Sequence, residues 1–339
     1  MKYFSNEIVF RGHPDKVCDQ ISAALLQSYV TQDKNTRAGI EVVGGKGIIF
    51  ITGEVTSKAK VDVEKVTKRV LSDIGYSTDY QIINNIGLQS KDISQGVDIG
   101  GAGDQGMMFG YACNDTKELL PVAMVILQKF AKTYDEKLLK CYEDFLPDGK
   151  AQITGIYDNN FKLIRIKDFT ISYQNKEINR EFTDNLIKQI ALRICSEYDI
   201  RVSNFHINPT GKFLIGGFEG DSGLTGRKIV VESYQSFANV GGGCMNGKDA
   251  TKVDFSASHK ARELAKRFLK EYQLNWCEVQ LSYAIGLDRP LAIYVDSNKG
   301  NIEISDNVYE ECTPKNIIND LNLLNIDYEE LAKYGHFVK

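Results

Sequence analysis

The sequence predicts an α+β fold made of three related units, each ordered as a helix, a β-hairpin and a helix. One observation is the spacing of apolar residues, which changes from helical to strand-like and back three times along the chain. The other is turn chemistry, because glycine, asparagine or aspartate stands between the paired strand-like runs. The intervals between the rounds are unequal, so the repeat is structural rather than literal.

The first unit is predicted as a helix over residues 15–30, a hairpin over residues 39–55 and a helix over residues 61–74. In the first helix, Val17, Ile21 and Leu25 recur at helical spacing. The hairpin turns at the glycine-rich residues 44–47, which supply the backbone freedom that a tight turn needs. Gly75 is a suitable C-cap for the second helix.

The second and third units repeat this order. The second is predicted as a helix over 118–132, strands over 151–157 and 161–173, and a helix over 183–196. The third is predicted as a helix over 256–270, strands over 277–285 and 291–295, and a closing helix over 313–324. We therefore divide the 339 residues into three repeats, 1–98, 99–215 and 216–339.

Composition limits the class of protein. With 41 basic and 45 acidic residues the net charge is −4, so no global basic field draws the chain to nucleic acid or anionic lipid. No apolar run approaches the roughly 18 residues of a membrane span, and residues 1–5 lack a signal-peptide core. The seven cysteines form no C-x-x-C pair, which favours reduced, buried thiols over a zinc site or disulfides. Together these features predict a soluble cytoplasmic protein.

Three linkers are unusually rich in glycine. They cover residues 89–106, 208–226 and 241–247. Glycine loses more conformational entropy on folding than any other residue, so such a density requires a reason. Two interpretations remain open from the sequence: the linkers are flexible surface turns, or their backbone approaches a ligand closely.

The first chemical constellation lies at the start of the first predicted helix. Pro14 suits the first helical turn, and Asp15 complements the positive end of the helix dipole. An ordinary helix start explains those two residues but not His13 and Lys16 beside them. In a chain with four histidines, an imidazole, a carboxylate and an ammonium so close together indicate a site for phosphate and a divalent metal.

The second constellation is basic. Arg227 and Lys228 follow one glycine-rich linker, Lys248 and Lys252 follow another, and Lys150 stands at the start of a predicted strand. An arginine can hold phosphate oxygens with two hydrogen bonds, while lysines act as point charges. A lone lysine on a loop is usually only solvated, but this clustering in an acidic protein favours polyphosphate binding.

Residues 242–248 match the G-x-x-x-x-G-K pattern of a P-loop with one departure. Asp249 stands where a P-loop has Ser or Thr for Mg²⁺. Residues 234–240, which precede the pattern, are typical of a loop rather than of the buried strand that a P-loop follows. The P-loop interpretation is therefore disfavoured.

A third group of residues consists of carboxylates next to glycine, namely Glu54, Asp104 and Asp221. Such residues ordinarily make local hydrogen bonds in turns. Local hydrogen bonding in a turn explains Glu54 and Glu41 less well, because both lie in strands that are otherwise nearly all apolar.

Three motifs occur in a fixed order: Gly-His-Pro-Asp-Lys at residues 12–16, Gly-Ala-Gly-Asp-Gln-Gly at 101–106 and Gly-Leu-Thr-Gly-Arg-Lys at 223–228. Asn-Pro-Thr-Gly at 208–211, Ser-Tyr-Ala-Ile-Gly at 282–286 and Tyr-Gly-His-Phe at 334–337 accompany them. This set resembles the methionine adenosyltransferase, or S-adenosylmethionine synthetase, family over nearly the whole chain.

The resemblance implies three α+β repeats about a pseudo-threefold axis. It implies synthesis of S-adenosylmethionine from ATP and L-methionine, with release of phosphate and pyrophosphate. Members of the family assemble as homodimers or dimers of dimers with active sites between subunits, and use Mg²⁺, two ions per site, and K⁺. These properties are expectations for the present chain.

Matching positions one by one, the resemblance also implies site residues. For catalysis they are His13, Lys150, Arg227 and Lys248. For ATP they are His13, Asp148, Lys150, Lys212, Phe213, Asp221, Arg227, Lys228, Cys244 and Lys248. For methionine they are Glu54, Gln89, Asp221 and Lys252. For metals they are Asp15 (Mg²⁺), Glu41 (K⁺) and, as a further candidate, Asp254.

The implied reaction is attack of the methionine sulfur on C5′ of ATP, with intact triphosphate leaving and then being hydrolysed. Fixed cations would stabilise the departing oxygen, and His13 would donate a hydrogen bond to it. A triphosphatase-type enzyme and a catalytically silent regulatory homologue are the alternatives. Retention of His13, Asp15 and Lys150 argues against a silent homologue.

The chain departs from the family in a few places. The loop between Gln89 and Asp104 is shorter than in bacterial relatives, and the corresponding loop gates the family's active site. We predict that residues 89–103 are mobile without ligand and ordered over bound product. Residues that differ from the usual family type are Arg11, Lys212, Val240 and Phe255, and the chain ends at Lys339, sooner after Phe337 than in relatives.

Overall fold

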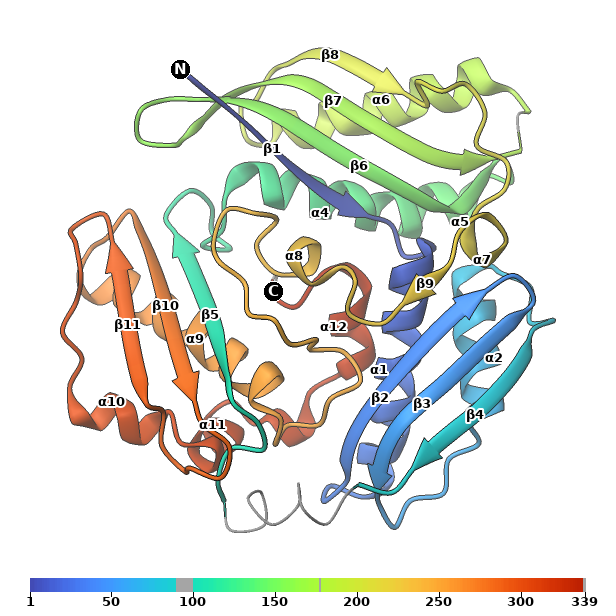
Figure 1. Cartoon of the computed structure of the whole chain (residues 1–339). Helices are drawn as coiled ribbons and strands as arrows, with labels where there is room; N and C mark the ends of the chain where they lie inside the picture. The colour runs from blue at the N-terminus through green and yellow to red at the C-terminus, as the bar shows by residue number, and fades with distance from the viewer. Residues whose placement is uncertain (90–99, 177, 338–339) are drawn as a thin grey trace.

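The computed structural model describes residues 1–89, 100–176 and 178–337 (Figure 1). In these residues three separate sheets surround a common centre, and helices accompany each sheet, so the predicted α+β class is confirmed. Sheet A has the order β1 (Lys2–Val9), β6 (Phe145–Tyr157), β7 (Leu163–Asn175) and β8 (Val202–Ile207). Sheet B has the order β4 (Gln81–Gly87), β3 (Ile48–Thr56), β2 (Arg37–Gly45) and β9 (Gly223–Leu224). Sheet C has the order β11 (Ala292–Ser297), β10 (Trp276–Tyr283) and β5 (Gly106–Cys113).

The helices follow the same three-part arrangement. The longer ones are α1 (Pro14–Gln32), α2 (Val63–Ile74), α4 (Val122–Thr133), α6 (Arg180–Ser196) and α9 (Val253–Glu271). The shorter ones are α5 (Leu139–Cys141), α7 (Gly217–Gly220), α8 (Ile229–Glu232), α10 (Asp306–Glu311), α11 (Pro314–Asp320) and α12 (Tyr328–Tyr334). A π-helical segment at Tyr134–Leu138 joins α4 to α5, and a 3₁₀ turn at Leu323–Asn325 follows α11. Among the described residues, none of the helices combines the length and apolar character that crossing a lipid bilayer requires.

Each sheet is covered by helices on one face only, and we call the other side the open face. In β10, Val279 and Leu281 are buried against the α9 side, while the alternate residues Glu278 and Gln280 are more exposed. This alternation is expected for a strand that packs on one face. In Figure 1 the open faces turn toward the viewer, with loops of residues 225–252 between the sheets.

The sheets exchange strands between distant parts of the chain. Strand β1 comes from the N-terminus but pairs with β6, and β5 pairs with β10 of the C-terminal part. Strand β9 likewise joins β2 across nearly 180 residues of sequence. Pairing of Val9 with Lys150 brings the start of α1 next to β6, which positions part of the site described below.

Helix α1 occupies the middle of the molecule and is buried along most of its length. His13 is its N-cap and Pro14 occupies its first turn, so its predicted start is confirmed. Helix α2 begins with Asp62, whose carboxylate accepts a hydrogen bond from the Lys65 amide, and ends at Gly75 in the left-handed conformation (φ 103°). Of these local signals, Pro14 and Gly75 were identified from the sequence.

Most predicted helices and hairpins are confirmed, but the closing helix over 313–324 is wrong. Helix α11 ends at Asp320, Asn322 adopts a left-handed φ of 50°, and a separate helix α12 follows. Strands β1, β4, β5, β8 and β9 were missed. Strands β1, β5 and β9 each pair with a strand far away in the sequence, and β4 and β8 each pair in parallel with the preceding strand across one helix, so pairing rather than their own pattern specifies them. All seven cysteines lie in the described residues. The prediction that the thiols are buried is wrong for Cys141, which lies exposed in the short helix α5.

Candidate active site

One end of the candidate site is organised around Asp15 in the first turn of α1. The Asp15 side chain is 1% exposed, and its Oδ1 accepts hydrogen bonds from the Leu224 amide (3.0 Å) and from Arg227 Nε (2.7 Å). Lys228 Nζ donates to Oδ2 at 2.5 Å. Burial by itself would raise the pKa of Asp15, but the hydrogen bonds from Lys228 and Arg227 hold it below its usual value. A buried carboxylate therefore anchors two cations.

His13 lies beside this pair. Burial and the nearby charge of Lys228 lower its pKa to about 4, so the imidazole is neutral near pH 7. Its Nδ1 accepts a hydrogen bond from the Asp15 amide at 3.2 Å. In a neutral imidazole whose Nδ1 is the acceptor, Nε2 carries the proton. His13 is thus prepared to donate a hydrogen bond through Nε2.

Lys150 reaches the same region from β6. Its ammonium pairs with Glu7 of β1 at 2.6 Å, and its positive charge contributes to lowering the pKa of His13. Asp221 also lies close enough for its charge to act on His13, in the opposite direction. We call His13, Lys150, Arg227 and Lys228, gathered around Asp15, the positive cluster.

Asp148 precedes Lys150 by two residues but is buried, and burial raises its pKa to about 6. Its carboxylate accepts a hydrogen bond from the Gly217 amide at 2.8 Å, so it holds the segment before Asp221 in place. In that segment Lys212 is exposed, and the Phe213 carbonyl accepts a hydrogen bond from the Asn175 amide at 2.9 Å.

Lys16 does not join the positive cluster, which corrects the prediction of an ammonium in the site. One residue further along a helix turns the side chain by about 100°, and Lys16 Nζ instead points inward to Glu232 (2.8 Å) and Asp19 (3.2 Å). The Lys16 side chain is only 3% exposed. Glu232 also accepts hydrogen bonds from Asn246, and Asp19 accepts one from the Gly226 amide at 2.9 Å. This buried ionic network supports the segment that carries Arg227 and Lys228.

The glycine-rich loops at 223–247 pack against the rest of the chain. The Gly247 carbonyl accepts a hydrogen bond from Ile40 of β2 at 3.0 Å, and Gly247 has a left-handed φ of 76°. A Cβ on Gly226 would lie 2.9 Å from Cys244, and one on Gly243 would collide with the Asp254 carboxylate. These glycines therefore permit close contact between protein segments, an explanation that neither sequence interpretation contained. Residues 234–241, which directly precede this segment, form no strand, and this confirms the rejection of a P-loop.

The other end of the candidate site is a cavity of about 450 Å³ on the open face, which we call the acidic cavity. Residues of β2 and β3, the 244–254 segment, Gly103, Asp104 and Ile285 surround it. Its ionisable side chains are Glu41, Glu54, Asp104, Lys248, Lys252 and Asp254. Lys248 pairs with Asp254 at 2.5 Å, and Lys252 pairs with Asp249 at 3.0 Å.

Tertiary structure thus brings most predicted site residues into two groups. Cys244 connects them, because it lines the acidic cavity and touches the loop of Arg227 at Gly226. Gln89 is described, and its side-chain amide nitrogen is buried without a hydrogen-bond partner among the described residues. The predicted gating behaviour of residues 89–103 falls largely on 90–99, which lie outside the described residues.

Two departures from the family pattern have structural explanations. Arg11 donates to Gln20 Oε1 (2.8 Å) and pairs with Asp135 (3.1 Å), so it ties α1 to the π-helical segment after α4. Phe255 is buried at the start of α9, where its ring lies 5.3 Å from that of Tyr328 in α12. Both residues therefore serve packing rather than the site.

The carboxylates suit a metal that is shared with a ligand. Within the described residues no group of three or more His, Cys, Asp or Glu side chains is placed to hold a metal ion. Mg²⁺ is commonly bound by one or two carboxylates together with substrate phosphates, rather than by a complete protein cage. Asp15, a buried carboxylate flanked by cations that suit phosphate, fits that use, and Asp254 and Glu41 offer further oxygens in the acidic cavity.

Fold and site together define an α+β protein with three sheets, a buried carboxylate that holds two cations at one end of the candidate site and a cavity of mixed charge at the other. Residues 1–95 match the N-terminal domain of S-adenosylmethionine synthetase, residues 99–213 its central domain and residues 215–339 its C-terminal domain. The chain therefore belongs to the S-adenosylmethionine synthetase family, whose members are methionine adenosyltransferases and generally use Mg²⁺ and K⁺.

Proposed function

We propose that this chain synthesises S-adenosylmethionine from ATP and L-methionine and releases phosphate and pyrophosphate. The observation that carries the proposal is the positive cluster. There, Arg227 and Lys228 from the loop after β9 bind one buried carboxylate, Asp15. His13, the N-cap of α1, lies beside them, and Lys150 from β6 is close enough for its charge to act on His13. Such a group of fixed cations and a neutral donor suits a triphosphate that gains charge as it leaves.

In the proposed reaction the methionine sulfur attacks C5′ of ATP while the bond from C5′ to the triphosphate oxygen breaks. Sulfur becomes positively charged, and negative charge concentrates on the departing oxygen. His13 donates from Nε2 to that oxygen, while Arg227 and Lys228 hold the phosphate oxygens. Water then cleaves the bound triphosphate to phosphate and pyrophosphate, which prevents reversal.

The role proposed for Asp15 changes during binding. In the described structure it pairs with Arg227 and Lys228, and a triphosphate would compete for both cations. The freed carboxylate would then be available to a Mg²⁺ ion held jointly with phosphate. Bound Mg²⁺ would supply charge neutralisation of the triphosphate, and K⁺ at Glu41 would balance the acidic cavity.

Methionine suits the acidic cavity because a zwitterion needs both signs of charge. Glu54 can accept from its ammonium, and Lys252 can pair with its carboxylate. Gln89 is proposed as a further donor, because its amide nitrogen has no hydrogen-bond partner among the described residues; it is not one of the residues that line the acidic cavity. Lys248 and Cys244 both line this cavity, and Cys244 also lies against Gly226 in the loop of Arg227, so the nucleotide is proposed to bridge the two ends there.

The proposed assembly is a homodimer, or a dimer of dimers, that closes the site between subunits. The open faces carry large exposed apolar side chains, among them Val43 (β2), Ile83 (β4), Met107 (β5) and Tyr294 (β11). The acidic cavity opens on the same side as these residues, so a partner that covers them would also cover the cavity. Sedimentation at micromolar concentration should give a dimer or larger species, and an active strict monomer would contradict this assembly.

The three repeats 1–98, 99–215 and 216–339 remain our proposed division of the sequence. It is a division of the chain and not of the space it fills, because β1 and β5 each join the sheet of another repeat.

One assay tests the proposed activity against its alternatives. The protein is incubated with ATP, methionine, Mg²⁺ and K⁺, and products are measured by mass spectrometry and phosphate release. S-adenosylmethionine that depends on methionine supports the proposal. Phosphate release from added triphosphate without S-adenosylmethionine would identify a triphosphatase instead. Absence of both products from protein that still binds ATP would identify a silent homologue.

A further inference from the structure

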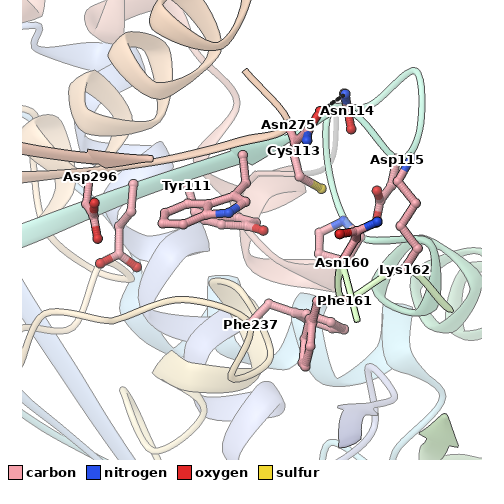
Figure 2. A pocket seen from close by; sticks show the side chains of 13 residues that line it. Tyr111, Cys113, Asn114, Asp115, Asn160, Phe161, Lys162, Phe237, Asn275 and Asp296 are labelled. Carbon is pink, nitrogen blue, oxygen red and sulfur yellow. Dashed lines mark hydrogen bonds between the residues drawn. The ribbon is translucent and has the colours of Figure 1, made fainter. Parts of the chain in front are cut away.

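A second cavity lies between sheet C and the tip of the β6–β7 hairpin (Figure 2). Its volume of about 460 Å³ falls within the roughly 300–1,000 Å³ of ligand pockets. It shares no lining residue with the acidic cavity. Its ionisable and aromatic lining residues are Tyr111, Asp115, Phe161, Lys162, Phe237, Trp276, Glu278 and Asp296.

Two carboxylates stand side by side on the wall that sheet C contributes. Glu278 of β10 lies directly opposite Asp296 of β11 in the strand register, and opposite Tyr111 of β5 on its other side. Like charges directly opposite each other on antiparallel strands are destabilising. Glu278 accepts hydrogen bonds from Asn239 and Asp296 accepts one from the Ser297 amide, but neither forms an ion pair with any residue that the structure describes.

At the opposite end of the cavity, the charges of Asp115 and Lys162 offset each other. Figure 2 shows Asp115 and Lys162 together at one end and Asp296 at the other. Burial raises the pKa of Asp115, and the charge of Lys162 acts to lower it. Lys162 is therefore matched by Asp115, whereas Glu278 and Asp296 have no paired cation in the part of the chain that the structure describes.

Aromatic rings complete the walls. Phe161, at the hairpin tip, is 38% exposed and has a left-handed φ of 60°, a costly conformation for a bulky side chain. Its ring stacks on Tyr157 with centroids 4.8 Å apart and lies 6.2 Å from Phe237. Trp276, the first residue of β10, contributes a ring to the wall formed by sheet C. The faces of such rings attract cations.

We propose that this cavity binds a small organic cation, namely an ammonium or sulfonium with an apolar body. The carboxylates of Glu278 and Asp296 would pair with the charge and relieve their mutual repulsion. The rings of Phe161, Phe237 and Trp276 would contact the body and add cation–π attraction. A bare metal ion fits less well, because aromatic rings occupy the places where oxygen ligands would be needed. The inference goes beyond the proposed function and does not depend on the proposed activity. Glu278 and Asp296 lie on the same face of sheet C as Tyr294, so the inference requires a homodimer that leaves this cavity open.

Trp276 makes the test specific, because it is the only tryptophan in the sequence. The full-length protein is titrated with phenethylammonium, and with uncharged 2-phenylethanol as its matched neutral probe, while tryptophan emission is recorded. Phenethylammonium should change the emission in a saturable way with a Kd of about 1 mM or tighter, and 2-phenylethanol should bind at least about tenfold more weakly. Equal binding of the two probes, or no change up to about 10 mM phenethylammonium, would overturn the proposal.

A charge-neutral variant tests the carboxylates. Glu278→Gln combined with Asp296→Asn should weaken phenethylammonium binding by about tenfold or more, and should fold because it removes a like-charge pair. The matched control, Glu181→Gln with Glu143→Gln, removes the same charge at exposed residues that do not line the cavity, and should bind as wild type. Unchanged affinity in the Glu278 and Asp296 variant would contradict the inference.

The same titration separates two sources of the cation. S-adenosylmethionine is a sulfonium, so a Trp276 signal that it produces, and that the Glu278 and Asp296 variant loses, would support a product-binding site. A signal with phenethylammonium and spermidine but not with S-adenosylmethionine would support a free amine as ligand. Either result retains an organic cation as the occupant.

Discussion

The positive cluster and the acidic cavity hold their charges differently. In the positive cluster one carboxylate, Asp15, is buried and binds both Arg227 and Lys228, so two cations are fixed by a shared partner. In the acidic cavity Glu41 and Asp104 are exposed, and charges of both signs line one open volume. The charged groups of the positive cluster are therefore held in place in advance, whereas the acidic cavity is open and carries charges of both signs.

This difference follows the chemistry that each end is proposed to serve. A transition state that develops charge is best stabilised by donors already in place, because their reorganisation then costs nothing during the reaction. An amino-acid substrate carries both an ammonium and a carboxylate, so its site needs both signs of charge. In the acidic cavity Lys248 and Lys252 each pair with a different aspartate, instead of sharing one buried carboxylate. The four predictions below test this contrast, from the largest expected effect to the smallest.

The largest effect is expected beneath the positive cluster. Lys16→Met leaves Asp19 and Glu232 buried without their cation, and should lower the free energy of unfolding by about 3–5 kcal/mol. Lys68→Met is the control, because Lys68 pairs with Glu64 on an exposed helix surface and such pairs contribute about 0–1 kcal/mol. Chemical denaturation at one protein concentration measures both. Similar losses would mean that the buried network does not support the cluster.

The next effect concerns the neutral donor. His13→Ala should reduce formation of S-adenosylmethionine by about several hundredfold, since one such donor contributes about 3–4 kcal/mol to the transition state. ATP affinity should change only slightly, because Arg227 and Lys228 remain. His206→Ala is the control, since His206 is exposed and pairs with Asp168 on the surface of sheet A. A His13 variant within about tenfold of wild type would remove His13 from the leaving-group role.

The protonation of His13 makes a prediction about stability. Its pKa is about 4 in the folded protein against 6.5 for the free side chain. As pH falls below 6.5 the unfolded chain takes up a proton that the folded chain refuses until about pH 4, so wild type loses stability. Between about pH 7 and pH 5, wild type should lose about 2 kcal/mol more unfolding free energy than His13→Ala.

Urea denaturation at both pH values measures this difference. Asp19 and Asp148, whose pKa values burial raises to about 6, act in the opposite direction: stability falls as pH rises from the unfolded value toward 6. They are present in both proteins and cancel in the comparison. Parallel pH profiles would show that the pKa of His13 is normal in the folded protein, and would contradict its role as a preassembled neutral donor.

The smallest effect compares one lysine from each end. Lys228 and Lys252 are similarly buried, with side chains 18% and 12% exposed, and each pairs with an aspartate. Lys228→Met should raise the KM for ATP by about tenfold and leave the KM for methionine nearly unchanged, and Lys252→Met should do the reverse. Steady-state kinetics with each substrate varied in turn measures both constants. Equal effects on both substrates would mean that the two ends do not bind separate ligands.

Local chemistry was enough to predict several elements. Pro14 and Asp15 marked the start of α1, the glycines at 44–47 marked the β2–β3 turn, and Gly75 marked the end of α2. Each of these signals depends on a few neighbouring residues, because caps and tight turns are closed by short-range hydrogen bonds. The family motifs also identified most residues that line the two ends.

The sequence by itself therefore determined the helix starts, the hairpins and the chemical types available to the site. Only the tertiary structure decided that Lys16 turns inward to Glu232 while Asp15, one residue earlier, binds Arg227 and Lys228. It also decided that β1 and β5 join sheets formed by distant residues. The physical reason is that burial, ion pairing and strand register depend on partners hundreds of residues away, and no local pattern specifies which partner a side chain will meet.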